Sequence, residues 1–392
     1  MAFKVMKPRL LVLTKLFWPE GSGAELATYI FLKRYLAGVF DVIVVSSTPK
    51  PTTDVLKCCR YVTWSALRSG VKPVEWALTT LGIDYIRGLI KWADVVYIPS
   101  HTLLPLALII KRVNPRARVV FHIHNHQLLT YTSVVLSNLG PGLRSDILVE
   151  LLENRSLARA LFTGILHGTK YLYWLALLRT DLVIFVTRKQ LDLALSYGLP
   201  VGRSAVVYNP PPEVSFTGKE LTKDPLLIYV GGDSFIKGFH ILLRALPRLI
   251  RSGVRLRLFG NYRRVIKLPN VEFVGRVSHD YLMRVHRYAW GLLFPSINEE
   301  PLPYAVVESA VSGTVPLVSN AGGAVEVLRG TPAEKFVFKV GDADDMADKV
   351  LSLVAEDTKK VFEIGLKTSG VVLKRLEESS RQLPRYILSI LD

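Results

Sequence analysis

The first half of the chain alternates short apolar runs with stretches of helical periodicity. Apolar runs stand at residues 10–14, 42–45, 95–98, 119–123 and 182–186, and helix-like runs at 26–36 and 104–111 lie between them. Runs without strict alternation predict strands that are buried on both faces. We therefore expect a parallel sheet with helices on both sides.

The same pattern restarts after a proline-rich interruption at Tyr208-Asn209-Pro210-Pro211-Pro212. Strands are predicted at 226–230, 256–259, 271–274, 291–295 and 315–318, with helices at 241–250 and 281–288. The pattern predicts an N-terminal domain at 1–207, a linker at 208–225, a C-terminal domain at 226–375, and a last helix at 376–392 that packs back on the N-terminal domain. The fold class is α/β with two parallel-sheet domains, which bind ligands at the carboxyl ends of their strands.

Composition indicates a reducing, cytoplasmic protein of two domains. The 392 residues are 49% hydrophobic and 21% charged, which suffices for two buried cores. Cys58 and Cys59 are neighbours, a geometry that rarely suits a mutual disulfide, and no Cys/His cluster offers a zinc site. The start of the chain does not have the pattern of a secretion signal. A polar segment interrupts the apolar stretch at 161–178, so we expect no membrane-spanning helix.

The net charge of +17 is carried mainly by the first half. Up to Arg203 the chain has 25 Lys/Arg against 12 Asp/Glu, or +13, and the remainder has 25 against 21, or +4. Such asymmetry attracts nucleic acid, an anionic membrane surface or a phosphorylated substrate, and charge does not choose among them. The stretch at 157–178, which is aromatic and leucine-rich with arginines beside it, fits either an interfacial helix or a core helix.

Two carboxylates flank the start of an apolar helix in the second half. The sequence E-P-L-P-Y-A-V-V-E runs from Glu300 to Glu308, and Pro303 suits the first helical position. Glu308 lies among apolar residues, where a carboxylate needs a polar partner. Free N–H groups at the helix start suit a phosphate. The two acids act either as an acid/base pair of the glycosidase kind or as groups that bind the hydroxyls of a sugar nucleotide.

Glycine-rich loops follow several predicted strands. Gly231 and Gly232 permit a tight turn after the strand at 226–230, and Lys237 supplies a point charge for a phosphate. The G-x-x-x-x-G-K-[ST] pattern of P-loop hydrolases is absent. Gly322 and Gly323 follow a later strand and offer backbone N–H groups. Each loop alone also fits plain turn chemistry.

Three alternating histidines, His122, His124 and His126, accompany the strand at 119–123. On one strand they share a face, which suits zinc. We favour the alternative in which His124 stands at the strand end and faces the ligand. There it hydrogen bonds a sugar hydroxyl or stabilises charge during the reaction, unless it is a structural histidine.

The segments at 230–238, 271–277, 295–308 and 318–326 together resemble the group 1 family of retaining nucleotide-sugar glycosyltransferases. The resemblance implies the GT-B fold, in which two Rossmann-like domains face each other across a cleft. The N-terminal domain then serves the acceptor and the C-terminal domain binds the donor. It implies that His124 and Glu300 are catalytic and that no metal or cofactor is needed. The implied donor-binding residues are Gly231, Gly232, Lys237, Glu308, Leu302, Tyr304, Gly23, Gly322 and Gly323.

Two positions depart from the family pattern. Gly232 stands where the family has an arginine that shares the diphosphate with the lysine, and Pro303 replaces a glycine between the two acids. The first change removes a charge-assisted contact and the second removes an N–H group. We expect another Arg or Lys near the loop to compensate.

The leading hypothesis is a metal-independent transferase that moves a sugar from a nucleoside-diphosphate-sugar to an acceptor hydroxyl, with retention. The basic first half together with the stretch at 157–178 favours an anionic acceptor, either lipid-linked or another glycan, at the cytoplasmic face of a membrane. No nucleic-acid motif overlays the basic stretches, so we expect no nucleic-acid partner. One alternative is a sugar-nucleotide epimerase or phosphorylase of related fold. Another is a non-catalytic protein that binds a sugar nucleotide or nucleic acid, for which Gly232 is the best support.

Overall fold

The computed structural model describes residues 6–214 and 218–392. Residues 1–5 of the predicted first domain and residues 215–217 of the predicted linker lie outside this description. The chain divides into two compact units, each of which combines segments that are distant in the sequence. As far as they are described, unit one contains Met1–Ser133, Leu166–Pro210 and Glu377–Asp392, and unit two contains Val134–Ile165 and Pro211–Leu376.

Unit one is built on a parallel sheet of seven strands in the order β3-β2-β1-β4-β5-β6-β7. The strands are β1 (Arg9–Leu13), β2 (Asp41–Ser46), β3 (Arg60–Thr63), β4 (Val95–Ile98), β5 (Arg118–Ile123), β6 (Leu182–Phe185) and β7 (Ser204–Val206). Leu10 of β1 lies opposite Val42 of β2 and Val95 of β4. The order reverses direction between β1 and β4, and such a point is where parallel sheets open a binding crevice.

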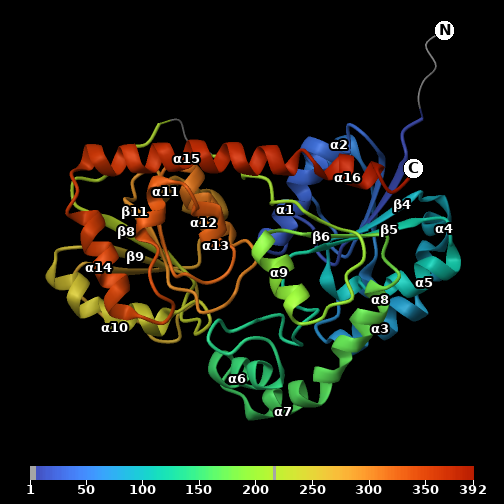
Figure 1. Cartoon of the computed structure of the whole chain (residues 1–392), viewed down its shortest axis with the longest axis horizontal. Helices are drawn as coiled ribbons and strands as arrows, with labels where there is room; N and C mark the ends of the chain where they lie inside the picture. Colours follow the sequence, from blue (N-terminus) through green and yellow to red (C-terminus); the bar gives the residue numbers. More distant parts are fainter. Residues whose placement is uncertain (1–5, 215–217) are drawn as a thin grey trace, which may run out of the picture. The chain divides into compact units, whose positions relative to one another are not determined.

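Helices cover both faces of this sheet and enclose one core on each side (Figure 1). Leu10 and Val12 belong to one core, and Leu11 and Leu13 belong to the other, as the period of a strand requires. The helical elements of this unit are α1 (Gly23–Phe31), η1 (Leu32–Leu36), α2 (Thr53–Cys58), η2 (Ser65–Leu67), α3 (Lys72–Leu81), α4 (Asp84–Trp92), η3 (His101–Leu103), α5 (Leu106–Val113), η4 (His167–Thr169), α8 (Lys170–Leu177), α9 (Arg188–Ser196) and α16 (Leu383–Leu388).

Unit two contains a parallel sheet of five strands in the order β10-β9-β8-β11-β12. The strands are β8 (Leu226–Val230), β9 (Arg255–Phe259), β10 (Val271–Gly275), β11 (Gly291–Phe294) and β12 (Val315–Val318). Here the order reverses between β8 and β11. The loops after these two strands therefore lie side by side, and they carry Lys237 and Glu300.

The helices of unit two lie around its sheet, except α6 and α7, which lie apart from the strands (Figure 1). They are α6 (Leu143–Glu153), α7 (Leu157–Leu166, whose last residue falls in unit one), α10 (Phe239–Arg251), α11 (His279–His286), α12 (Tyr304–Val311), α13 (Ala324–Leu328), η5 (Pro332–Phe336), α14 (Ala343–Val354) and α15 (Thr358–Ser380, which continues into unit one). Helix α10 packs against α14, and α12 packs beside β11 and β12. Helices α6 and α7 form a hairpin that precedes β6 in the chain but groups with this unit.

The predicted α/β class with two parallel-sheet units is confirmed. Strands β4, β8 and β12 have the predicted bounds. The prediction that Pro303 is the first helical residue is wrong. Pro303 is the N-cap of α12 with extended backbone (φ −70°, ψ 115°), and the helix begins at Tyr304. The described residues contain no helix that is long and apolar enough to cross a membrane.

Candidate functional site

The loop between β8 and α10 is shaped by glycines at positions where a side chain would be strained in this structure. Gly238 caps α10 in the left-handed region (φ +77°), and a Cβ there would lie 1.8 Å from the carbonyl oxygen of Pro295. Gly232 has φ +60°, and its Cβ would lie 2.5 Å from the carbonyl oxygen of Asn261. The loop thus lies against its neighbours without side chains in between, and this fixes where Lys237 points.

Lys237 and Glu300 form the polar centre of the site. The Lys237 ammonium lies 2.8 Å from both Glu300 carboxylate oxygens, and the two side chains are 33% and 14% exposed. The Ser296 hydroxyl donates to the same carboxylate at 3.0 Å. The ammonium also lies 5.6 Å from the centre of the Phe294 ring. A partly buried cation is therefore held in place at the ends of β8 and β11, where an anionic ligand can share it.

The glycines of the A-G-G-A-V-E segment are tied to the acidic loop. The Gly322 N–H donates to Glu299 at 2.7 Å, and the Gly323 N–H donates to the Glu300 carbonyl at 2.8 Å. Gly322 has φ +59°, and a Cβ there would lie 2.3 Å from the Glu300 carbonyl oxygen. These two N–H groups are engaged within the protein and hold the backbone around Glu300.

Glu308 is buried in α12 and meets His279 at the start of α11. The distance from His279 Nε2 to Glu308 Oε1 is 2.7 Å, and the carboxylate side chain is only 8% exposed. The hydrogen bond with Glu308 raises the pKa of His279 above its ordinary value, against the opposing effect of burial. The polar partner that the sequence required for Glu308 is therefore His279. Tyr304, the first residue of the same helix, and Leu302, two positions before it, are buried.

His124 directly follows β5 in unit one. Its ring lies 4.4 Å from that of His122, and neither of its ring nitrogens has a hydrogen-bond partner in the described structure. Burial lowers the pKa of His124 to about 3, so the imidazole is neutral near pH 7 and offers one donor and one acceptor. His122 instead bonds the Tyr97 hydroxyl at 2.6 Å. His124 and His126 lie beyond the strand end, so the three histidines do not line one strand face.

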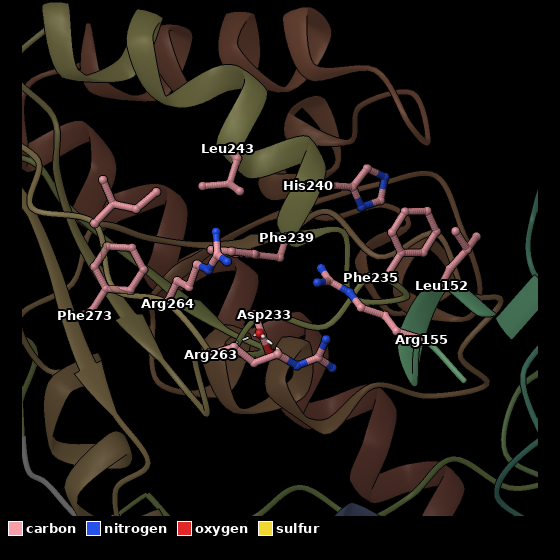
Figure 2. Close-up of a pocket in the computed structure, with 11 residues that line it drawn as sticks. Leu152, Arg155, Asp233, Phe235, Phe239, His240, Leu243, Arg263, Arg264 and Phe273 are labelled. Carbon is pink, nitrogen blue, oxygen red and sulfur yellow. Dashed lines mark hydrogen bonds and ion pairs between the residues drawn. The ribbon is translucent and has the colours of Figure 1, made fainter. Parts of the chain in front are cut away.

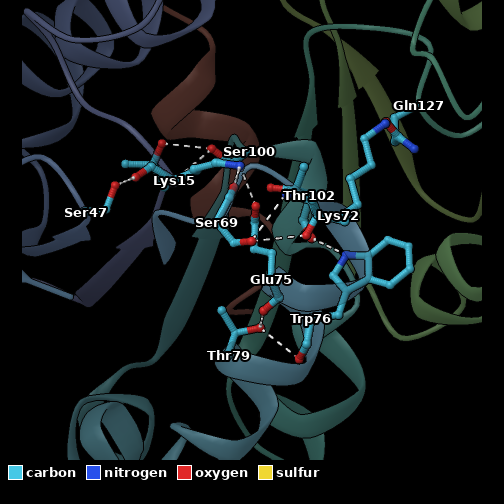
Figure 3. A network of polar contacts seen from close by, with 12 residues as sticks. Lys15, Ser47, Ser69, Lys72, Glu75, Trp76, Thr79, Ser100, Thr102 and Gln127 are labelled. Atoms are coloured by element: carbon cyan, nitrogen blue, oxygen red, sulfur yellow. Dashed lines mark hydrogen bonds and ion pairs between the residues drawn. The ribbon is translucent and has the colours of Figure 1, made fainter. Parts of the chain in front are cut away.

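A polar network surrounds the ends of β1 and β4 in the same unit (Figure 3). Lys15 donates to Glu75, which is fully buried, and to the Ser69 carbonyl at 2.7 Å. Lys72 donates to Gln127 at 2.6 Å. Gly23 is the first residue of α1, whose start is capped by Glu25 accepting from the Ser22 N–H at 2.7 Å. Among residues 6–214 and 218–392, no group of three or more His, Cys, Asp or Glu is arranged to hold a metal ion.

Sequence reasoning missed the residues that hold the predicted ones in place. These are His279, Ser296, Glu299 and Glu153, whose carboxylate accepts from the N–H groups of Phe235 and Ile236 at 2.8 and 3.1 Å. Glu299 stands beside Glu300 and is the one that a search for paired acids could have found. His279 and Glu153 are 29 and up to 83 positions from their partners, and Ser296 belongs to no motif.

Residues 212–363 match the family model described as glycosyl transferases group 1. This segment belongs to the group 1 glycosyltransferase family. An uncharacterized glycosyltransferase from Methanocaldococcus jannaschii is 26% identical over 118 residues, which are 27% of this chain and 30% of that protein. Glycogen synthase from Mycobacterium tuberculosis is 32% identical over 114 residues, 26% of this chain and 27% of that protein. The matches thus span less than a third of these curated relatives.

Solved structures resemble the chain over almost its whole length. Sucrose-phosphate synthase from Thermosynechococcus elongatus has a TM-score of 0.74 at 14% identity and covers 98% of this chain and 99% of its own. HepE from Anabaena, in complex with UDP-glucose, has a TM-score of 0.67 at 16% identity and covers 97% and 99%. Identities this low show the fold alone, which is the two-domain GT-B fold.

Proposed function

We propose that the chain is a retaining, metal-independent glycosyltransferase that moves a sugar from a nucleoside-diphosphate-sugar to an acceptor hydroxyl. The observation that carries this is the contact between Lys237 and Glu300 at the ends of β8 and β11, with buried Glu308 on the helix that follows. The family match over residues 212–363 and a structural neighbour solved with UDP-glucose support it.

The proposed chemistry depends on charge stabilisation. The bond between the sugar C1 and the diphosphate oxygen breaks, the acceptor oxygen bonds to C1, and the acceptor proton passes to a diphosphate oxygen. Lys237 and the first-turn N–H groups of α12 stabilise the charge that develops on the diphosphate. Glu308 accepts hydrogen bonds from the ribose hydroxyls and Glu300 from the transferred sugar. Neutral His124 hydrogen bonds the sugar.

Arg263 is our candidate to compensate for Gly232. Asp233 directly follows Gly232 in the loop. The Arg263 backbone N–H donates to the Asp233 carboxylate at 3.1 Å, and the Arg263 guanidinium lies 3.5 Å from the same carboxylate. Arg263→Gln then weakens donor binding about tenfold, the value of one charge-assisted hydrogen bond. Unchanged affinity in isothermal titration would assign the compensation elsewhere.

The acceptor in this proposal is anionic or lipid-linked and is met at the cytoplasmic face of a membrane. The excess of +13 up to Arg203 supports an anionic acceptor. A thermal-shift screen with UDP-, GDP- and ADP-sugars identifies the donor class first. Product NMR then reports the anomeric configuration, and turnover that persists in EDTA supports the metal-independent mechanism. Inversion, or free epimerised sugar as the product, contradicts the proposal.

Two substitutions test the donor site. Glu308→Ala removes the acceptor for the ribose hydroxyls, and Lys237→Ala removes the cation, so we expect kcat/KM to fall about 100-fold in each. Glu356→Ala is the matched control, because Glu356 pairs with Lys335 at the surface of unit two (3.0 Å). Wild-type turnover by either site variant would refute the assignment.

A further inference from the structure

Helix α7 exposes most of its large apolar side chains, whereas its buried residues are the small Ala160 and Thr163. The exposed set shares one side of the helix and consists of Leu157 (67% exposed), Leu161 (62%), Phe162 (48%) and Ile165 (81%). On the opposite side Ala160 and Thr163 are each 2% exposed. A surface helix of a globular protein has the reverse arrangement. The apolar side of α7 therefore faces away from its own unit.

The inner side of α7 packs on α6, so the hairpin is held together without any contact through the apolar side of α7. Glu150 of α6 accepts from Arg159 at 2.8 Å and from Thr163 at 3.5 Å. A Cβ at Gly164 would meet Ile147 and Leu143 at 3.9 Å, which is ordinary van der Waals contact. The next helix, α8, buries Tyr173 in the core of unit one. Of the two alternatives left open for residues 157–178, the core helix thus fits α8 and the interfacial helix fits α7.

The acidic and basic side chains of the hairpin differ in exposure. Asp146 is fully buried and Glu150 is 6% exposed, whereas Arg144, Arg155 and Arg159 are exposed. The third acid, Glu153, binds the N–H groups of the loop before Lys237. The hairpin therefore presents arginines to its surroundings while its acids face the protein.

A cavity of about 540 Å³ adjoins the turn between α6 and α7 (Figure 2). Leu152 and Arg155 of the hairpin line it together with Arg263 and Arg264 of the β9–β10 connection. Neither Arg155 nor Arg264 forms an ion pair with another residue of the described chain. Arg155 stands two positions before Leu157 of α7, and Arg264 lines the same cavity as Arg155. Guanidinium groups bind phosphate well.

We propose that the α6–α7 hairpin docks on an anionic lipid bilayer, with the apolar side of α7 in the interface and Arg155 and Arg264 at the lipid phosphates. Interfacial helices combine apolar side chains with flanking cations in this way. A symmetric dimer through the same side would instead bring the arginines of two copies together. The inference deepens the proposed function, on which it rests only for the lipid-linked acceptor.

The test is flotation of the full chain with phosphatidylcholine vesicles, with and without phosphatidylglycerol. We expect binding to the anionic vesicles that declines as salt is raised. Leu161→Glu with Ile165→Glu should weaken binding at least about tenfold, because charged groups replace the inserted apolar ones. Arg155→Gln with Arg264→Gln should reduce binding to anionic vesicles about tenfold. Leu366→Glu, at a 60% exposed leucine of α15, is the matched control and should bind as the wild type does.

Two results would overturn the proposal. One is vesicle binding that is absent in the wild type or unchanged in Leu161→Glu with Ile165→Glu. The other is a dimer in sedimentation velocity that the same pair of substitutions dissociates, which would assign this side to a second copy. Unfolding temperatures check that the variants are folded. Donor affinity is measured without vesicles, so failure of the lipid proposal is distinguishable from failure of the proposed transferase function.

Discussion

At the scale of single residues, the site depends on pairing each buried acid with a defined partner. Glu308 would be costly inside an apolar helix without His279, and Glu300 is held by Lys237 and Ser296. The sequence predicted Lys237, Glu300 and Glu308 because their spacing matches a family pattern. It did not predict their partners, because a hydrogen bond between distant segments leaves no local pattern.

The His279–Glu308 contact predicts a pH dependence of stability. The pKa of His279 is raised in the folded protein, so the contact stabilises fully below the ordinary histidine pKa of about 6.5 and is lost as pH rises through the raised value. His279 is 28% exposed, so we expect an effect of about 1 kcal/mol. The difference in unfolding temperature between the wild type and His279→Gln should therefore shrink from pH 5.5 to pH 8.5.

His240, in the same unit, should show the opposite pH dependence of stability. Burial and Arg244 lower the pKa of His240, so its contribution is present above the ordinary histidine pKa and is lost as pH falls. His240→Gln should therefore gain stability relative to the wild type at acid pH. Identical pH trends for the two variants would contradict the interpretation of His279.

At the scale of elements, the turns after the strands position the site residues, whereas the strands are the elements that the sequence predicts best. Strands β8 and β12 were predictable because they are short, apolar and buried on both faces. Strand β3 is half-exposed and β7 has three residues, and neither has a clear apolar pattern. The α6–α7 hairpin was not predicted to group with unit two, because its contact with that unit depends on Glu153, which accepts from Phe235 and Ile236, rather than on periodicity.

Gly238→Ala tests how far the loop depends on close approach. The residue has φ +77°, and its Cβ would meet the Pro295 carbonyl oxygen. Strain and clash together should destabilise unit two by about 3 kcal/mol. Gly253→Ala is a matched control with φ +74° and no atom within 4 Å, and should cost about 1 kcal/mol. Equal unfolding temperatures for the two variants would show that the contact with Pro295 relaxes freely.

At the scale of the whole molecule, residues 377–392 complete a core that begins at the other end of the sequence. Leu383, Ile387 and Ile390 are at most 5% exposed and share a core with Leu10 and Val12. Three such side chains contribute about 2 kcal/mol each. A chain without residues 377–392 should therefore lose the thermal transition of unit one, whereas removal of exposed Asp392 alone should not. An unchanged transition in the shorter chain would contradict this.

The discontinuity of unit one also has a consequence for biosynthesis. A ribosome releases the strands of unit one first, but the segment that covers Leu10 and Val12 is translated only after all of unit two. During that interval the nascent chain carries an uncovered apolar surface, which favours chaperone binding. The part of the protein that is made first is thus the part that finishes folding last.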